Sequence, residues 1–350
     1  MRVSDFDFDL PPELIAQAPA SPRDSARLLH VPRKTGFADL TISDLPGLLN
    51  ADDLLVVNDT KVIPTRLTGR KHREDGEGAR IEATLHKADG PDTWRAFARP
   101  AKKLNVEDII DFADDFFAEV SEKHDGGEVV LKFNAGGQAL MEAIHKHGIM
   151  PLPPYIKRDR QGMVTDIDDY QTLFAAREGA VAAPTASLHF TPRLISAIEA
   201  RGIKTAHLTL HVGAGTFLPV KSDNTDDHVM HAEWGELSQP SADLINATKS
   251  RGGRIVAAGT TALRLLESAA DESGTVHPFT GDTDIFITPG YRFRTADVLL
   301  SNFHLPKSTL FMLVSAFAGL ERMHHAYAHA KETGYRFYSY GDATLLERAE

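Results

Sequence analysis

Polar and apolar residues alternate along several short segments in the first half of the chain. The alternation is clearest in residues 79–85, 93–99, 116–120 and 128–133, and turns rich in Gly and Asp separate these segments. A period of two is typical of strands that bury one face, and short strands at close intervals favour an antiparallel sheet or barrel. A helix is predicted over residues 138–147, where it would plug or flank this barrel.

From residue 191 onward the pattern changes to strands and helices that follow one another. The predicted strands are 204–210, 254–259 and 284–287, and the predicted helices are 191–202, 241–250, one that opens at 260–261, and 309–330 with a possible break at Gly319. This order is typical of an α/β sheet domain. An earlier buried strand over residues 53–58 ends in a polar turn at 58–61, ahead of the barrel-like segment.

These elements predict an α/β main domain with an inserted small antiparallel β-barrel domain. Two domains also fit the length of 350 residues. The expected division is residues 1–66 plus 150–350 for the catalytic α/β domain and 67–149 for the barrel. Pro151-Leu152-Pro153-Pro154-Tyr155-Ile156 is predicted to be a stiff, extended linker between them.

Composition excludes several classes of chemistry. The chain has no cysteine, which rules out disulfides, a thiol nucleophile, a zinc ribbon and a cysteine-ligated iron–sulfur cluster. Residues 1–10 alternate Asp with Phe and do not resemble a signal peptide. The longest nearly apolar run, 309–320, is too short to span a bilayer, so we expect a cytoplasmic protein without membrane contact.

The charge is distributed unevenly. The net charge is −11, yet residues 61–103 hold 11 Lys or Arg against 6 Asp or Glu, whereas residues 104–128 hold 1 Lys against 9 Asp or Glu. A basic patch on an acidic protein can hold a phosphate backbone locally. The alternative is chance clustering on a solvated face of the sheet.

Residues 300–310 carry an amide, an imidazole, an ammonium and hydroxyl groups at the start of an apolar helix. A helix start presents unpaired N–H groups and partial positive charge, which suits an anionic ligand. Pro306 and Ser308 are residue types favoured at this position. The alternative is a capped core helix without a ligand.

Two further loops follow predicted strands. Residues 211–217 contain two glycines that let backbone N–H groups approach a ligand, but Leu218 replaces the third glycine of a dinucleotide fingerprint. Residues 259–261 join a buried strand to a helix, the usual location of ligands in open α/β sheets. A plain tight turn and a plain helix cap are the respective alternatives.

Two other segments combine histidine with acidic or small residues. In residues 228–233, two His and one Glu have a spacing that fits a strand, and they suggest acid–base chemistry more than metal binding. Residues 183–190, together with Tyr170, suggest the floor of a narrow pocket, with simple packing as the alternative. No metal site is predicted, and the histidines at 324, 325 and 329 are interpreted as surface residues.

Laid out in order, these motifs closely resemble one family. The matching segments are 58–64, 151–156, 183–190, the glycine loop 211–217, 259–261, 302–310 and 335–342. On these segments the chain resembles the S-adenosylmethionine:tRNA ribosyltransferase-isomerases of queuosine biosynthesis. The resemblance runs from Asp5 to about Leu346, nearly the whole chain.

The resemblance implies a reaction. Such an enzyme transfers and isomerises the ribosyl part of S-adenosylmethionine onto 7-aminomethyl-7-deazaguanine at the wobble position of tRNA, giving epoxyqueuosine-tRNA, adenine and methionine. S-adenosylmethionine is then a consumed substrate, and no cofactor is expected. The tRNA anticodon stem-loop that carries the modified wobble base is the expected partner, and the protein is expected to be a monomer. An S-adenosylmethionine-dependent RNA methyltransferase and a non-catalytic RNA-binding module are the competing functions.

The motifs supply candidate residues for these roles. The catalytic candidates are His211, His231, Glu233 and His304. The candidates for contact with substrate are Asn58, Thr60, Lys61, Tyr155, Tyr170, Thr185, His189, Gly213, Gly215, Thr216, Gly259, Thr260, Thr261, Asn302, Lys307, Ser308, Thr309 and Asp342.

Some candidates have more specific expected roles. Lys307 or the helix start at 259–261 would hold the methionine carboxylate, and Glu233 or Asp342 would balance the sulfonium charge. Tyr155, Tyr170 and Phe217 are candidate stacking faces for the tRNA base. If the basic run binds the stem, charge reversal at Arg70, Lys71 and Arg73 should flatten the salt dependence of tRNA affinity.

Overall fold

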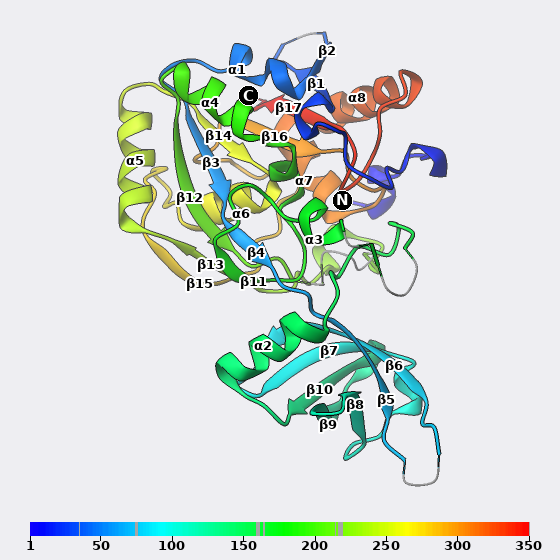
Figure 1. Ribbon diagram of the computed structural model, residues 1–350. Helices are drawn as coiled ribbons and strands as arrows, with labels where there is room; N and C mark the ends of the chain where they lie inside the picture. Colours follow the sequence, from blue (N-terminus) through cyan, green and yellow to red (C-terminus); the bar gives the residue numbers. More distant parts are fainter. Residues whose placement is uncertain are drawn as a thin grey trace.

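The chain folds into a large part built on a mixed β-sheet and a small closed barrel that extends from it (Figure 1). The computed structural model describes residues 1–34, 36–73, 76–158, 162–163, 165–213, 215 and 220–349. The predicted fold class, an α/β part with an inserted antiparallel barrel, is confirmed. No helix among the described residues is both long and apolar enough to cross a membrane.

The large sheet has nine strands with a parallel centre. Their order is β15 (Phe279–Thr283), β13 (Glu233–Leu237), β12 (Lys204–Leu210), β3 (Leu54–Asn58), β14 (Ile255–Ala258), β16 (Val298–Asn302), β17 (Ala343–Glu347), β1 (Arg27–Val31) and β2 (Ala38–Thr41). The four strands β12, β3, β14 and β16 are parallel to one another. Every residue of β3, β14 and β16 is buried, as expected for parallel strands covered on both faces.

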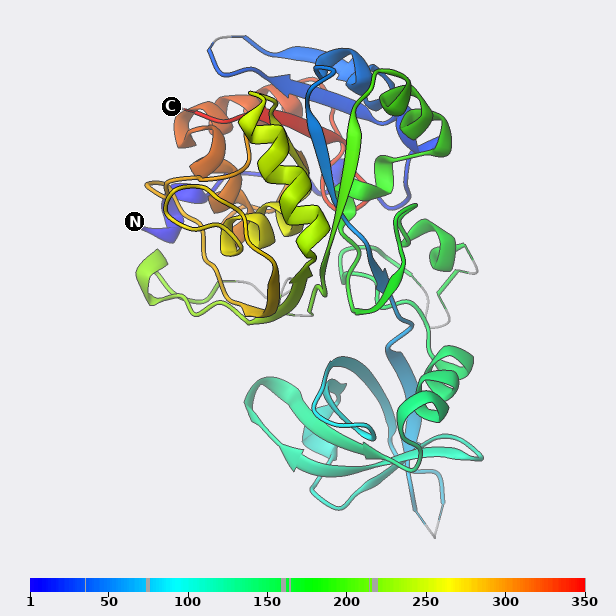
Figure 2. The same cartoon turned by 90° about the vertical axis from the view of Figure 1, so that its left-hand side faces the viewer.

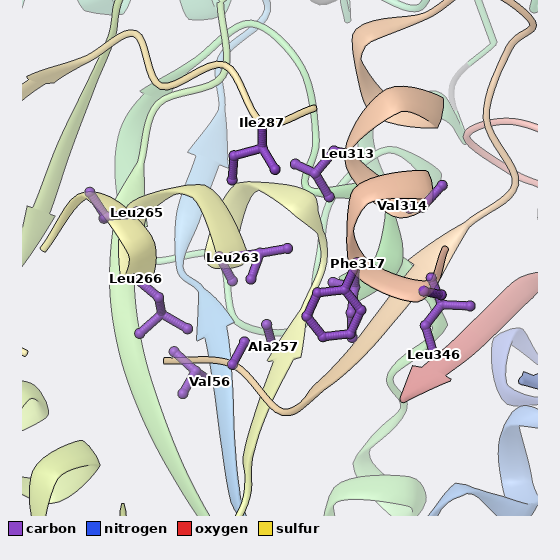
Figure 3. Close-up of a cluster of buried hydrophobic side chains, with 14 of the residues drawn as sticks. Val56, Ala257, Leu263, Leu265, Leu266, Ile287, Leu313, Val314, Phe317 and Leu346 are labelled. Atoms are coloured by element: carbon purple, nitrogen blue, oxygen red, sulfur yellow. The ribbon is translucent and has the colours of Figure 1, made fainter. Parts of the chain in front are cut away.

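Helices cover the two faces of this sheet. They are α1 (Leu45–Leu48), α4 (Pro192–Ala200), α5 (Gln239–Ser250), α6 (Thr260–Ser268), α7 (Thr309–Ala318) and α8 (Leu320–Glu332). The short helix α3 (Asp166–Asp169) contributes no residue to the two hydrophobic clusters on the sheet. Because side chains alternate along a strand, Val56 joins the core beneath α5 to α8, and Val57 joins the core beneath α1 and α4. Figure 3 shows the first core, where Val56 lies near Leu266 of α6, in the same cluster as Phe317 of α7.

The barrel is closed by six antiparallel strands. They are β5 (Arg66–Lys71), β6 (Arg80–Ala88), β7 (Thr93–Arg99), β8 (Ile109–Ala113), β9 (Phe116–Lys123) and β10 (Glu128–Phe133), in the spatial order β10-β7-β6-β5-β8-β9. Helix α2 (Gly137–His147) buries Leu140 and Ile144 in the barrel core, which confirms the predicted flanking helix. The four predicted barrel strands are confirmed, whereas β5 and β8 were not predicted.

Two neighbouring segments join the barrel to the sheet part (Figure 2). The outgoing segment follows β4 (Thr60–Val62), which pairs with β11 (Arg177–Ala180). Arg66 and Ile149 then exchange two backbone hydrogen bonds of 3.2 and 3.0 Å, so both segments cross side by side. A Cβ at Gly148 would lie 1.8 Å from the Pro64 carbonyl oxygen, so this approach requires glycine.

Most of the elements predicted from residue 151 onward are confirmed, with three differences. The predicted strand 284–287 is wrong, because β15 already ends at Thr283. The predicted strand at 228–233 contributes only Glu233, the first residue of β13. The expected extended linker at 151–156 is wrong as well, because the Ile156 N–H donates to the Pro153 carbonyl at 3.0 Å and the segment turns back into the core.

The second-half helices follow their sequence signals closely. Ser308 caps α7 by accepting from the Phe311 N–H at 3.1 Å, as its residue type predicted. Gly319, with φ of +94°, separates α7 from α8 at the predicted break. The predicted polar turn after β3 is shorter than expected, since only Asp59 separates β3 from β4.

Candidate functional site

Four strand ends meet at one edge of the large sheet. The parallel strands β12, β3, β14 and β16 all run towards this edge, and each leads into one of the loops singled out by residue type. Open α/β sheets bind ligands at the carboxyl ends of their strands. A cavity of about 480 Å³ lies there, lined by residues 182–186, 259–261 and 301–305 and by Tyr155, Tyr170 and Tyr338; we call it the edge cavity.

The loop after β14 brings backbone N–H groups to the edge cavity. Gly259 has φ of +99°, a conformation that a side chain disfavours, and it passes directly into α6 at Thr260. Among the residues that the structure describes, no side chain caps this helix start. The first N–H groups of a helix have no partner within the helix, so they remain available to a ligand with partial negative charge.

His304 is enclosed in the wall of the edge cavity. Its Nε2 shares a 2.8 Å hydrogen bond with the Ser301 hydroxyl, and its backbone N–H donates to the Tyr327 hydroxyl at 2.9 Å. Burial lowers the pKa of His304 to about 3, since an enclosed ring cannot be solvated as a cation. The imidazole is therefore neutral near pH 7 and held in one orientation.

Aromatic rings form another wall of this cavity. Tyr155 stacks on Tyr338 with ring centroids 4.3 Å apart and an interplanar angle of 19°. The Tyr155 hydroxyl lies 2.6 Å from the Ser339 hydroxyl, and burial raises the pKa of Tyr155 to about 12. Flat, uncharged rings at a cavity wall suit a planar base or a compact cation.

A second cavity of about 550 Å³ lies between the barrel and the sheet part; we call it the barrel-side cavity. The barrel contributes Phe97, which stacks on His86 at 4.6 Å, and Glu128, which lies 2.9 Å from the His86 Nε2. The sheet part contributes His228 and His231. Acidic side chains outnumber basic ones around it: Asp125, Glu128, Asp227 and Glu233 against Lys221 and Arg264.

Arg264 and Leu310 line both cavities and so mark their junction. The Arg264 Nη1 forms a buried ion pair with Glu233, and the Gly213 N–H donates to the other carboxylate oxygen at 2.9 Å. The two charged residues are only 5% and 7% exposed. Within the described part of the chain, the Arg264 Nη2 is buried without a hydrogen-bond partner.

The structure brings many of the predicted site residues together. Those that line the edge cavity are Tyr155, Tyr170, Thr185, Gly259, Thr260, Thr261, Asn302, His304 and Ser308. Those that line the barrel-side cavity are Gly215, His231, Glu233 and Thr309. A Cβ at Gly215 would lie 2.7 Å from the His231 ring, so glycine permits this contact. Thr216, with Phe217 and Leu218, lies outside the described residues.

The remaining predicted residues line neither cavity: Asn58, Thr60, Lys61, His189, His211, Gly213, Lys307 and Asp342. Most of them are engaged elsewhere. Lys307 pairs with Asp7 at 2.7 Å, and Lys61 pairs with Glu178 at 2.9 Å. The Asp342 carboxylate accepts from backbone N–H groups of the chain, so its expected role beside the sulfonium has no geometric support.

His211 is held behind the site rather than in it. Its Nδ1 lies 2.7 Å from the Thr60 hydroxyl, and its ring stacks on Trp234 at 5.2 Å. A Cβ at Gly179 would lie 2.7 Å from the same ring. Asn58 is likewise internal, since its carbonyl accepts from the N–H groups of Thr60 and Leu210. These contacts join β3, β4 and β12.

Sequence reasoning did not select Arg264 as a site residue. Its partner Glu233 lies 31 residues earlier, at the start of β13. No local sequence pattern reveals that this end of β13 lies beside α6. The only sequence signal was its place one turn after the loop 259–261. Among the described residues, no group of three or more His, Asp or Glu has the geometry to hold a metal ion.

Comparisons with known proteins point to one family. Residues 3–346 match the family model described as queuosine biosynthesis protein. The chain is 62% identical to S-adenosylmethionine:tRNA ribosyltransferase-isomerase of Parvibaculum lavamentivorans over 99% of both chains. It is 61% identical to the protein of the same name from Beijerinckia indica, over 100% of this chain and 97% of the relative.

A solved structure also resembles the fold. The crystal structure of S-adenosylmethionine tRNA ribosyltransferase from Thermotoga maritima superposes with a TM-score of 0.55 at 34% identity. The match covers 98% of this chain and 99% of that chain. The likeness therefore includes both the sheet part and the barrel.

Proposed function

The chain belongs to the queuosine biosynthesis protein family and is an S-adenosylmethionine:tRNA ribosyltransferase-isomerase, and from this premise we propose that the edge cavity binds S-adenosylmethionine. The observation that carries the proposal is the meeting of four strand ends, the open start of α6 and the neutral His304 in one enclosed space. Its volume of about 480 Å³ is that of a small-molecule site.

His304 is the proposed proton acceptor for the first step of the reaction. A proton next to the sulfonium must be removed, and only an uncharged imidazole accepts a proton. Burial keeps His304 in that form, and Ser301 fixes the orientation of its ring. A sulfonium cation nearby further disfavours protonation of the resting enzyme. Tyr155 and Tyr338 offer a face for the adenine base.

The barrel-side cavity is the proposed site of the modified tRNA base. Chemistry on a base in tRNA requires that the base leaves its stack, and flipped bases are held by stacking on aromatic side chains. Phe97 supplies such a face, and the excess of acidic side chains complements the aminomethyl cation of 7-aminomethyl-7-deazaguanine. His231 is a candidate acid or base for the amine.

These assignments change the earlier expectations for two residues. His211 is proposed to support the loop after β12 from behind, since it touches neither cavity. Glu233 is proposed to act through its ion pair with Arg264 instead of as a free base. The enzyme is further proposed to work as a cytoplasmic monomer on the anticodon stem-loop, with S-adenosylmethionine consumed and no additional cofactor.

Release of adenine tests this assignment. Purified protein is incubated with S-adenosylmethionine and tRNA that carries the modified base, and free adenine and methionine are followed by mass spectrometry. His304→Ala should lower kcat by about 10²-fold or more, the usual contribution of a general base. His325→Ala is the matched control, because His325 is exposed on α8 and lines neither cavity.

Three outcomes would contradict the proposal. Near-normal turnover by a folded His304→Ala variant would exclude His304 as the proton acceptor. S-adenosylhomocysteine as the product would indicate a methyltransferase. Binding of tRNA without release of adenine would indicate an RNA-binding module.

A further inference from the structure

The junction of the two cavities has the chemistry of an anion site. Helix α6, of nine residues, begins at Thr260 on the edge cavity without a side-chain cap. Helix α7, of ten residues, begins at Thr309 on the barrel-side cavity. Both helix starts carry partial positive charge, and both face spaces that share Arg264 and Leu310.

Arg264 adds a charged donor at this junction. Arg264 lies one turn after the start of α6, and its side chain lines both cavities. Its Nη1 is bound by Glu233, while its Nη2 is buried without a partner among the described residues. A buried donor left unpaired is costly, and a guanidinium is well shaped to bind a carboxylate or phosphate.

Of the groups in the proposed substrates, the methionine carboxylate fits this position. S-adenosylmethionine carries one carboxylate, at the end of the chain attached to its sulfur. We propose that the Arg264 Nη2 binds this carboxylate and thereby orients the sulfonium nucleoside. The inference rests on the proposed function, because it presumes that S-adenosylmethionine occupies the edge cavity. It replaces the expected role of Lys307, which pairs with Asp7 and lines neither cavity.

A phosphate of the tRNA backbone has the same chemistry and must be distinguished. Isothermal titration compares wild-type protein with two ligands, S-adenosylmethionine and its decarboxylated form, and separately with tRNA. If Arg264 binds the carboxylate, the wild type should bind S-adenosylmethionine about tenfold to a hundredfold more tightly than the decarboxylated form, the usual value of a hydrogen bond to a charged group. This ratio of the two affinities is measured on the wild-type protein alone.

Substitutions then test whether Arg264 causes this difference in affinity. In Arg264→Gln the two affinities should differ by less than about twofold, because only the carboxylate loses its partner. That variant leaves Glu233 buried without its cation, so Glu233→Gln/Arg264→Gln removes both charges and protects the fold. The matched control is Arg254→Gln, which also breaks a pair with a buried aspartate, Asp53, at the opposite edge of the sheet. It should keep the wild-type ratio.

The inference is overturned if a folded double variant keeps the wild-type ratio of affinities. It is overturned as well if that variant loses affinity for both nucleosides by the same factor, because Arg264 would then have a merely structural role. It is also overturned if Arg264→Gln weakens tRNA binding while the two nucleosides are unaffected, since the anion is then a phosphate. If the wild type binds both nucleosides equally but releases adenine, only the role of Arg264 fails. If it binds neither, the proposed function fails.

Discussion

His304 and His189 are enclosed histidines, and their burial should make the free energy of unfolding depend on pH. Burial lowers the pKa of His304 to about 3 and that of His189 to about 4, against an ordinary value of 6.5. Between pH 6.5 and these values the unfolded chain binds protons that the folded protein does not. The free energy of unfolding should therefore fall as the pH is lowered through this range.

For His304 the predicted slope is about 1.4 kcal/mol per pH unit well below pH 6. Urea unfolding of wild type and His304→Gln between pH 7 and pH 5 measures it, and the variant should show the shallower decline. His325→Gln, at an exposed position, should keep the wild-type slope. If the free energies of unfolding of the wild type and His304→Gln change in parallel with pH, the pKa of His304 is the same in the folded and unfolded states.

At the residue scale, the type of a side chain indicated its chemistry but not whether it is free to bind a substrate. The sequence predicts substrate contacts for Lys307 and Lys61, yet both form ion pairs with residues remote in sequence, Asp7 and Glu178 respectively. Arg264 is the opposite case, because its unpaired Nη2 depends on the position of Glu233 across the fold. The loops of the site were recognisable from sequence, but the pairing of their charges depends on tertiary contacts.

At the scale of elements, regular alternation was a reliable guide. Strands β6, β7 and β9 alternate buried residues with more accessible ones, as the sequence pattern predicted, whereas β10 was predicted correctly although it buries residues 129–131 in succession. Strand β5 has a glycine in its middle, at Gly69, and Leu67 is its only apolar residue, so its sequence shows no apolar alternation. Strand β16 is buried at every position, and such an apolar run does not distinguish a strand from the start of the helix that follows.

The charged strands of the barrel illustrate the same limit. The basic and acidic runs of the sequence become neighbours, because β5 pairs with β8 and β7 with β10. Lys71 consequently lies 2.6 Å from Asp108 of the acidic run, while Arg70 lies 3.2 Å from Glu77 of the basic run itself. Two of the three cations expected to bind the stem, Arg70 and Lys71, are therefore paired within the barrel.

The 3₁₀ turn at Ala101–Lys103 is a better candidate for contact with phosphate. Lys102 and Lys103 are exposed, and no partner for them lies among the residues that the structure describes. The turn touches the loop at the barrel-side cavity, since a Cβ at Gly127 would lie 3.6 Å from the Ala101 Cβ. Lys102→Gln/Lys103→Gln should lower the slope of log affinity for tRNA against log salt by about 1 to 2.

Filter binding at several salt concentrations measures this slope. Arg70→Gln/Lys71→Gln removes the same charge and should change the slope little, because both cations are already paired. If the slope changes more in this control than in the Lys102 and Lys103 variant, Arg70 and Lys71 contact the tRNA phosphates and the turn does not.

At the scale of the whole molecule, the barrel and the sheet part do not share a hydrophobic core. The barrel core draws on residues 63–144, and none of the other three hydrophobic clusters includes a residue between 67 and 148. The edge cavity is lined by the sheet part alone, whereas the barrel-side cavity needs both parts. We therefore propose that the barrel is a separate domain that presents the tRNA base to a nucleoside site formed without it.

Removal of the barrel tests this division of labour. Arg66 and Ile149 are paired across the two crossing segments, so their Cα atoms lie within about 6 Å and a short Asn-Gly turn can replace residues 67–148. The shortened protein should unfold cooperatively and bind S-adenosylmethionine within about threefold of the full chain, because the edge cavity keeps all its lining residues. Its affinity for tRNA and its release of adenine should be lost together, because the barrel-side cavity loses Phe97 and Glu128. Circular dichroism during thermal unfolding, titration with S-adenosylmethionine and the adenine assay give the three readouts. A shortened protein that folds but no longer binds the nucleoside would show that the barrel shapes the edge cavity, and one that still modifies tRNA would assign the base to the sheet part.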